Sequence, residues 1–283
     1  MMFVNIHLHP LLIFFIFISI ITGTFVSLFI ILTIVLWHEL GHYAAAKYYK
    51  WRVDSIMLWV FGGVMKTDES FYRPIKEESI VTIAGPLQHI VIFIFIYILS
   101  FYSIIPESIV QEAYYYNWMI LTFNLLPISP LDGGKLLLLI QSSFLPYYTA
   151  FRWTILSSIG ICIGILIMQS VWLPFTWSAF ALGCFLLLEN YRAWKEQHYV
   201  LIRFLLFRGQ QVKQTSMEVI QVQETFSLMD VFCRWKRNKT HRMLIERQGN
   251  ILGKVDEQFC LDSYFKDHHV TTTIGEIMNF KDV

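Results

Sequence analysis

The sequence predicts an α-helical polytopic membrane protein, with six transmembrane helices followed by a small α+β domain. Hydrophobic residues make up 55% of the 283 positions and charged residues only 15%, against a usual charged share of about 25%. Apolar stretches long enough to cross a bilayer recur up to about residue 190, and beyond it the sequence becomes polar. Lysine and arginine also gather on alternate connections between these stretches. A soluble enzyme does not have this pattern.

Six apolar segments are expected to form the membrane helices. They are Pro10–Ile21, Thr24–Tyr48, Ile80–Ile105, Tyr114–Leu145 with an interruption, Ala150–Met168 and Val171–Leu188. Only Thr22 and Gly23 separate the first two, which predicts a tight helical hairpin. The N-terminus lacks a basic region and a small-residue cleavage site, so its apolar segment is expected to be a retained span rather than a signal peptide.

The distribution of positive charge predicts the orientation. With six spans, one side of the membrane receives Lys47, Lys50, Arg52, Lys66, Arg73, Lys76, Arg152, Arg192 and Lys195. The connections on the other side contain no lysine or arginine. By the positive-inside rule, the N-terminus and the C-terminal domain are expected to be cytoplasmic.

The chain is expected to divide into a membrane domain over residues 1–190, an amphipathic linker over 191–211 and a cytoplasmic domain over 212–283. In the last part, Met217–Val222 and Met243–Glu246 are predicted strands and Ser227–Lys236 a helix. Gly249 and Asn250 form the expected turn into a third strand and a further helix. The four cysteines form no CxxC pair and are expected to be reduced.

The sequence HELGH lies inside the second apolar segment, at His38–His42. Four residues advance an α-helix by about one turn, so His38 and His42 share a face and can bind one zinc ion. Glu39 lies beside them, where it can accept a proton from a zinc-activated water. A charged side chain at membrane depth costs at least about 2.5–3.5 kcal/mol, which favours a functional site over a structural histidine pair.

The interruption of the fourth segment is the second candidate site. At 1.5 Å per residue, His38 lies about 21 Å along its helix and the break lies about 20 Å along the fourth. The break contains Pro127, Pro130 and Asp132, and irregular backbone at this depth must face protein or a water-filled cavity. Asp132 is therefore the predicted third zinc ligand; a helix-capping role is the alternative. Asn124 either orients a ligand or substrate or makes an interhelical hydrogen bond.

Two shorter features complete the candidate site. Trp59–Val64 is apolar and contains Gly62 and Gly63 after Phe61. It is either a re-entrant loop or an extended edge that receives a substrate strand, or an interfacial loop without substrate contacts. His89 lies near the start of the third apolar segment, directly after Ala84–Gln88. It is either a structural histidine or a group that holds the oxyanion.

At these residues the sequence resembles the site-2 protease family of intramembrane zinc metalloproteases. HELGH at His38–His42, FGG at Phe61–Gly63, AGPL at Ala84–Leu87 and NLLPISPLDGG at Asn124–Gly134 occur in the family's order. The resemblance implies a zinc endopeptidase in which His38, His42 and Asp132 bind the metal and Glu39 is the general base. Phe61, Gly62, Gly63, His89, Asn124 and Pro130 are expected to bind substrate or support the site. Many family members carry asparagine in place of His89.

Within the family, AGPLQH, PLDGGKLL and the short tail are most similar to members that process a sporulation sigma factor precursor. This implies a pro-sigma-K-like substrate, the mother-cell membrane around the forespore, and inhibitory membrane proteins of the FA and BofA type. The tail resembles a single cystathionine-β-synthase-type (CBS) module. Such modules act in pairs, which implies a homo-oligomer and possible ATP binding.

Two other functional classes are weighed against a protease. Intramembrane histidines and carboxylates also mark ion paths in metal transporters, although no internal repeat is found. The third class is a nucleotide-sensing membrane scaffold that acts through its tail. The formal net charge of +1 points to no particular partner, and direct nucleic-acid binding is not expected.

Overall fold

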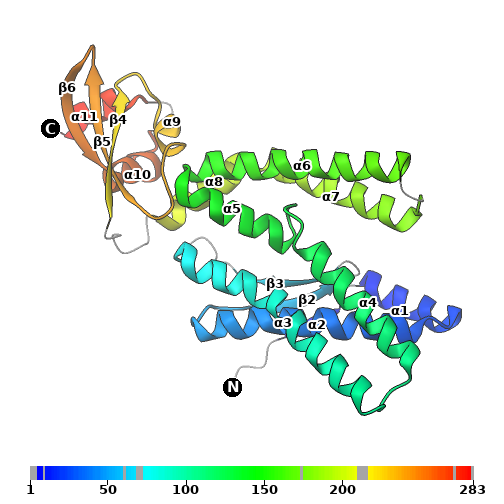
Figure 1. The fold of residues 1–283 in the computed structure, drawn as a ribbon. Coiled ribbons are helices and arrows are strands. Elements are labelled where there is room, and N and C mark those ends of the chain that lie inside the picture. Colours follow the sequence, from blue (N-terminus) through cyan, green and yellow to red (C-terminus); the bar gives the residue numbers. More distant parts are fainter. Residues whose placement is uncertain are drawn as a thin grey trace. The chain divides into compact units, whose positions relative to one another are not determined.

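The computed structural model describes residues 5–8, 10–59, 62–67, 73–172, 175–208, 216–269 and 272–281. They fall into two compact units, Met1–Leu136 and Leu137–Val283, and Figure 1 shows the elements of each. The division falls inside one helix, well before the predicted domain boundary at residue 190. That boundary stays a prediction.

The first unit contains a helical core and a small sheet. Its elements are β1 (Asn5–Leu8), α1 (Pro10–Thr22), α2 (Phe25–Tyr48), β2 (Ser55–Trp59), β3 (Gly62–Lys66), α3 (Ile75–Phe101), α4 (Glu107–Asn124) and the first turn of α5 (Asp132–Phe144). The interruption of the fourth segment is confirmed, because α4 ends at Asn124 and α5 begins at Asp132.

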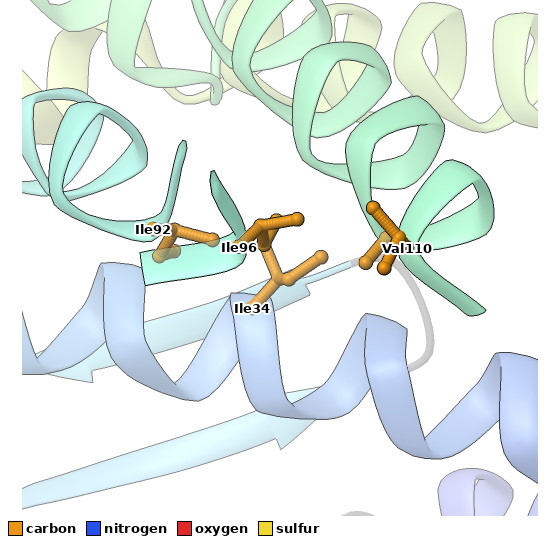
Figure 2. Packing of buried hydrophobic residues seen from close by; sticks show 5 residues of the cluster. Ile34, Ile92, Ile96 and Val110 are labelled. Carbon is orange, nitrogen blue, oxygen red and sulfur yellow. The ribbon is translucent and has the colours of Figure 1, made fainter. Parts of the chain in front are cut away.

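Helices α2, α3 and α4 pack together through branched aliphatic side chains (Figure 2). Ile34 of α2 meets Ile92 and Ile96 of α3, and Val110 of α4 closes the same cluster. Burying one such side chain contributes about 1.5–3 kcal/mol relative to water, and close packing also restricts how the helices can shift. The cluster therefore holds α2, which carries the HELGH sequence, against α3 and α4.

The small sheet has the order β1-β2-β3, with β1 parallel and β3 antiparallel to β2. The segment around Gly62 and Gly63 is thus extended, as one of the interpretations from sequence predicts; Phe61 lies outside the described residues. Strand β1 was not expected. It has only four residues, and its pairing with Ser55–Leu58 is a contact between distant parts of the sequence that no local pattern reveals.

The second unit joins a group of helices to the predicted α+β tail. Its elements are the rest of α5, α6 (Tyr147–Val171), α7 (Trp177–Lys195), α8 (Gln197–Arg208), β4 (Met217–Gln223), α9 (Leu228–Phe232), β5 (Thr240–Arg247), β6 (Asn250–Asp256), α10 (Glu257–Phe265) and α11 (Ile274–Lys281). Strand β4 is parallel and β6 antiparallel to the central β5. The predicted order of elements in the tail is confirmed; its likeness to a CBS module stays a prediction.

The tail also holds charged and thiol groups in defined environments. Hydrogen bonds and charge from Lys236 and Lys239 lower the pKa of Glu218. Burial, assisted by the nearby charge of Asp230, raises the pKa of Cys233 to about 11. None of the four cysteines forms a disulfide in the described part of the chain, and their reduced state stays a prediction.

Three helices in the described ranges are long and apolar enough to cross a membrane, namely α2, α3 and α6. Helix α1 is apolar but shorter. Large apolar side chains are exposed along these helices, among them Phe29 at 70% and Ile94 at 56%. Exposure of this kind is unfavourable in water and is expected for helix faces that contact lipid.

Candidate metal centre

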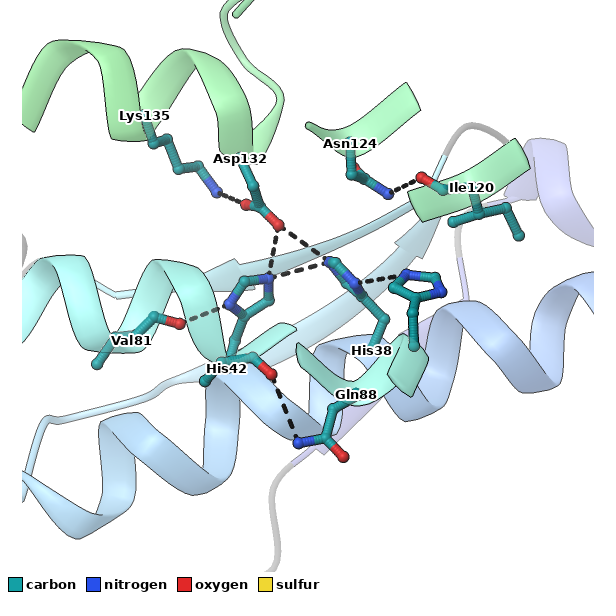
Figure 3. Close-up of polar contacts among 10 residues, drawn as sticks. His38, His42, Val81, Gln88, Ile120, Asn124, Asp132 and Lys135 are labelled. Atoms are coloured by element: carbon teal, nitrogen blue, oxygen red, sulfur yellow. Dashed lines mark hydrogen bonds and ion pairs between the residues drawn. The ribbon is translucent and has the colours of Figure 1, made fainter. Parts of the chain in front are cut away.

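Two helices of the first unit bring the candidate site together. Helix α2 carries His38, Glu39 and His42 on its buried side. Asp132 is the first residue of α5, directly after the interruption, and is only 4% exposed. Figure 3 shows the carboxylate of Asp132 pointing toward the two imidazole rings. The interruption therefore lets a side chain from a distant part of the sequence reach the α2 histidines.

The three predicted ligand atoms form a nearly equilateral triangle. Asp132 Oδ2 lies 3.1 Å from His38 Nε2 and 3.0 Å from His42 Nε2, and the two nitrogens are 3.1 Å apart. Ligand atoms about 2.0–2.2 Å from a tetrahedral zinc ion lie roughly 3.3 Å from one another. A slight widening of the triangle would admit the ion, so these residues fit a zinc site.

The groups behind the ligands set their orientation. Val81 of α3 supplies a carbonyl oxygen 2.8 Å from His42 Nδ1. A carbonyl only accepts, so His42 Nδ1 carries the proton, and Nε2 of the neutral ring keeps its lone pair for a metal. Lys135 Nζ donates to Asp132 Oδ1 at 3.2 Å, which leaves Oδ2 facing the histidines (Figure 3).

Glu39 lies beside the triangle and is 5% exposed. One of its carboxylate oxygens lies within 4.8 Å of ring nitrogens of His38 and His42. Its other neighbour is Gly63 of β3, where an added Cβ would collide with the Glu39 side chain. The strand can approach the carboxylate this closely only because position 63 has no side chain.

A second close approach positions His42. A Cβ at Gly85 of α3 would collide with the His42 imidazole, and a Cβ at Gly41 would lie 2.6 Å from the Ala84 carbonyl oxygen. Small residues on both helices thus let α2 and α3 pack backbone to backbone. This contact places the Val81 carbonyl within hydrogen-bond distance of His42.

The remaining predicted residues do not join the triangle directly. His89 contacts His38 from the side opposite the ligand atom. Asn124 donates to the carbonyl of Ile120 in its own helix (Figure 3), Pro130 is exposed, and Phe61 is outside the described residues.

Sequence reasoning missed Asn117, which is fully buried and bonded to His89. It directly follows three tyrosines, Tyr114–Tyr116, in the fourth apolar segment. A polar amide in the middle of an apolar span was the available signal.

Comparison with known proteins agrees with this geometry. Residues 26–107 match the model of peptidase family M50. The chain is 36% identical to stage IV sporulation protein FB of Bacillus subtilis over 97% of its own length and 96% of that protein. It is 33% identical to a zinc metalloprotease of Methanocaldococcus jannaschii over 50% of the chain and 41% of that protein.

A solved structure, the site-2 protease from M. jannaschii, has the same fold over 68% of this chain and 92% of its own, with a TM-score of 0.54 and 25% identity. The chain therefore belongs to the site-2 protease family, peptidase family M50. It is a zinc metalloprotease of the membrane, and the predicted family and enzyme class are confirmed.

Proposed function

We propose that this protein is an intramembrane endopeptidase that cleaves a membrane-associated precursor, the pro-sequence of a pro-sigma-K-like sporulation sigma factor. The observation that carries the proposal is the triangle of ligand atoms from His38, His42 and Asp132, with Glu39 beside it. The substrate class rests on similarity to a sporulation protein along nearly the whole chain.

In this proposal, His38, His42 and Asp132 hold one zinc ion. When bound, zinc makes a water molecule acidic enough to attack at neutral pH and polarises the scissile carbonyl. Glu39 accepts the proton of the attacking water and returns it to the leaving amine nitrogen. Burial of the site excludes bulk water, which strengthens the electrostatic interactions of these groups with the reacting atoms.

Strand β3 is the proposed receptor for the substrate. A helical substrate must unwind before its carbonyl can be attacked, because helix hydrogen bonds and side chains shield it. An extended peptide could pair with the edge of β3, since β2 occupies only its other edge. Gly63 would then place that peptide next to Glu39. Phe61, Gly62, Asn124 and Pro130 complete the proposed substrate contacts.

The proposed membrane arrangement has six crossings, with the N-terminus and the tail in the cytoplasm. The absence of lysine and arginine from the opposite connections supports this orientation. By its relationship to a sporulation protein, the proposed location is the mother-cell membrane around the forespore. Membrane inhibitors of the FA and BofA type, assembly through the CBS-like tail and ATP binding there stay predictions.

Co-expression with pro-sigma-K from the same organism tests the proposal. The wild type is expected to yield a shortened sigma factor on an immunoblot, and Glu39→Gln is expected to yield none. Glu189→Gln, a partly exposed carboxylate on α7 paired with Arg192, is the matched control and should cleave normally. Processing by Glu39→Gln would contradict the assigned base. If the wild type, Glu39→Gln and Glu189→Gln all leave pro-sigma-K uncleaved while each binds zinc, pro-sigma-K is not the substrate.

The metal-transporter and nucleotide-sensing scaffold hypotheses are not favoured. The chain's relatives include zinc metalloproteases, and its solved structural neighbour is a protease. The scaffold hypothesis predicts that Glu39→Gln leaves scaffolding and nucleotide sensing largely intact, whereas proteolysis should be abolished, so the same variant separates these classes.

A further inference from the structure

We propose that His89 and Asn117 form a relay that fixes the tautomer of His38, so that His38 presents an unprotonated Nε2 to the metal. The proposal rests on the zinc site of the proposed function and adds two positioning residues to it. Asn117 acts through His89, and His89 acts through Nδ1 of His38 rather than through the ligand atom Nε2.

The relay is continuous and buried. His38 Nδ1 lies 3.1 Å from His89 Nε2, and His89 Nδ1 lies 2.7 Å from Asn117 Oδ1. The Asn117 amide nitrogen donates to the backbone carbonyl of His89 at 3.1 Å. His89 and Asn117 are both fully buried, at 0% exposure. Water therefore cannot replace a missing partner at low cost.

The direction of each hydrogen bond follows from the carbonyl of His89. A carbonyl only accepts, so it must face the NH₂ group of Asn117 and not its oxygen. The Asn117 oxygen then faces His89 Nδ1, which must carry a proton to donate. The hydrogen bonds of the His89 ring go to His38 and Asn117 and to no carboxylate among the described residues. Burial of an unpaired imidazolium is costly, so the ring is neutral and its Nε2 accepts.

His38 must therefore donate through Nδ1, and its Nε2 is left with a lone pair. This is the atom 3.1 Å from Asp132 Oδ2 and from His42 Nε2. A metal-binding histidine commonly donates its second ring N–H to a fixed acceptor, which orients the ring and raises its basicity. In His42 a backbone carbonyl is that acceptor, whereas in His38 a replaceable side chain takes the role.

This arrangement favours a structural role for His89 over the alternative of holding the oxyanion. Both of its ring nitrogens are engaged, one by His38 and one by Asn117. It also contacts the Nδ1 side of His38, whereas the ligand atom is Nε2.

The test measures zinc affinity by chelator competition on the full-length protein purified in detergent, together with the visible spectrum of the cobalt-substituted protein. His89→Leu keeps the volume but removes the acceptor. His89→Gln restores an acceptor oxygen near the position of Nε2. Gln88→Ala is the control on the same helix, because the hydrogen bonds of Gln88 to described residues go to Trp37 and to Ala84 of its own helix.

We expect His89→Leu to bind zinc about 10–100-fold more weakly and to alter the cobalt spectrum. His89→Gln should recover most of the affinity, and Gln88→Ala should match the wild type. Wild-type affinity in His89→Leu, or an equal loss in His89→Leu and His89→Gln, would overturn the relay.

If His89→Leu does not fold, Asn117→Leu and Asn117→Gln give the decision, since only the second keeps both an acceptor for His89 Nδ1 and a donor for the His89 carbonyl. Equal affinities in that pair would also overturn the relay. His38→Ala separates the two proposals. If the wild type binds zinc no better than His38→Ala, the proposed zinc site is wrong. If His38→Ala loses zinc while the His89 and Asn117 variants keep it, only the proposed relay is wrong.

Discussion

At the scale of single residues, two kinds of neighbour position the site. Some accept a hydrogen bond from the ring N–H of a histidine, and others are glycines that leave room because they have no side chain. The ring protons of His42 and His38 are directed by the Val81 carbonyl and by His89. Gly63 has no Cβ, and this leaves room for the Glu39 side chain between β3 and the ligand triangle. Residues outside the proposed ligand set therefore position both the proposed ligands and the proposed base.

Gly63→Ala tests the contribution of this missing side chain. The new methyl group would displace the Glu39 carboxylate, and a misplacement of about 1 Å can reduce a rate by about 100-fold. We expect cleavage of pro-sigma-K to fall to that extent while zinc content stays at one ion per chain. Gly160→Ala is the control, because its Cβ would enter open space. Normal cleavage by Gly63→Ala would show that Glu39 does not need this approach.

At the scale of the elements, the contact between α2 and α3 decides whether the site forms. Gly41 and Gly85 bring the two backbones together, and the aliphatic cluster of Ile34, Ile92, Ile96 and Val110 holds α4 against both. Because interiors are close-packed, one extra methyl group at such a contact forces the helices apart or distorts side chains.

Gly41→Ala tests this contact. The added methyl would meet the Gln88 side chain and the carbonyl of Ala84, and overpacking of this kind typically costs about 1–3 kcal/mol. Thermal unfolding of the chelator-treated protein in detergent should therefore show a lower Tm, independent of zinc. Gly164→Ala, which adds a methyl where no atom lies within 4 Å, should leave Tm unchanged. Equal Tm values for the two variants would argue against tight packing at Gly41.

At the scale of the whole molecule, the complete ligand triangle belongs to the first compact unit, and the tail belongs to the second. Within the second unit the tail is bound firmly to the helices that precede it. Arg208 at the end of α8 pairs with Glu257 and donates to the carbonyls of Lys236, Arg237 and Lys239. Tyr147 of α6 donates its backbone N–H to the Trp235 carbonyl. The tail is therefore more than a module on a flexible tether.

Arg208→Leu is expected to loosen this attachment. Both partners of the ion pair are largely buried, with side-chain exposures of 7% for Arg208 and 11% for Glu257, and removal of one partner of a buried pair costs about 3–5 kcal/mol. Limited proteolysis should cleave the tail of this variant much faster. The control is Arg242→Leu, whose pair with Asp256 is exposed and contributes about 0–1 kcal/mol. Equal protection of both variants would contradict the buried role of Arg208.

The sequence by itself determined the family, the helical positions, the interruption of the fourth segment and the order of elements in the tail. These features depend on local patterns: apolar length, proline and glycine, and the helical spacing of HELGH. It also singled out His38, Glu39, His42 and Asp132, because polar groups at membrane depth are costly and rarely lie there without a use.

Only the tertiary structure decided which groups support those residues. Strand β1, the pairing of His89 with Asn117, and the approach of Gly63 to Glu39 all join positions that are distant in the sequence. No periodicity encodes such contacts, because they depend on how α2, α3, α4 and the small sheet pack against one another. The proposed ligands could thus be predicted from helical spacing and matching membrane depth, whereas the proposed direction of their ring protons required the three-dimensional arrangement.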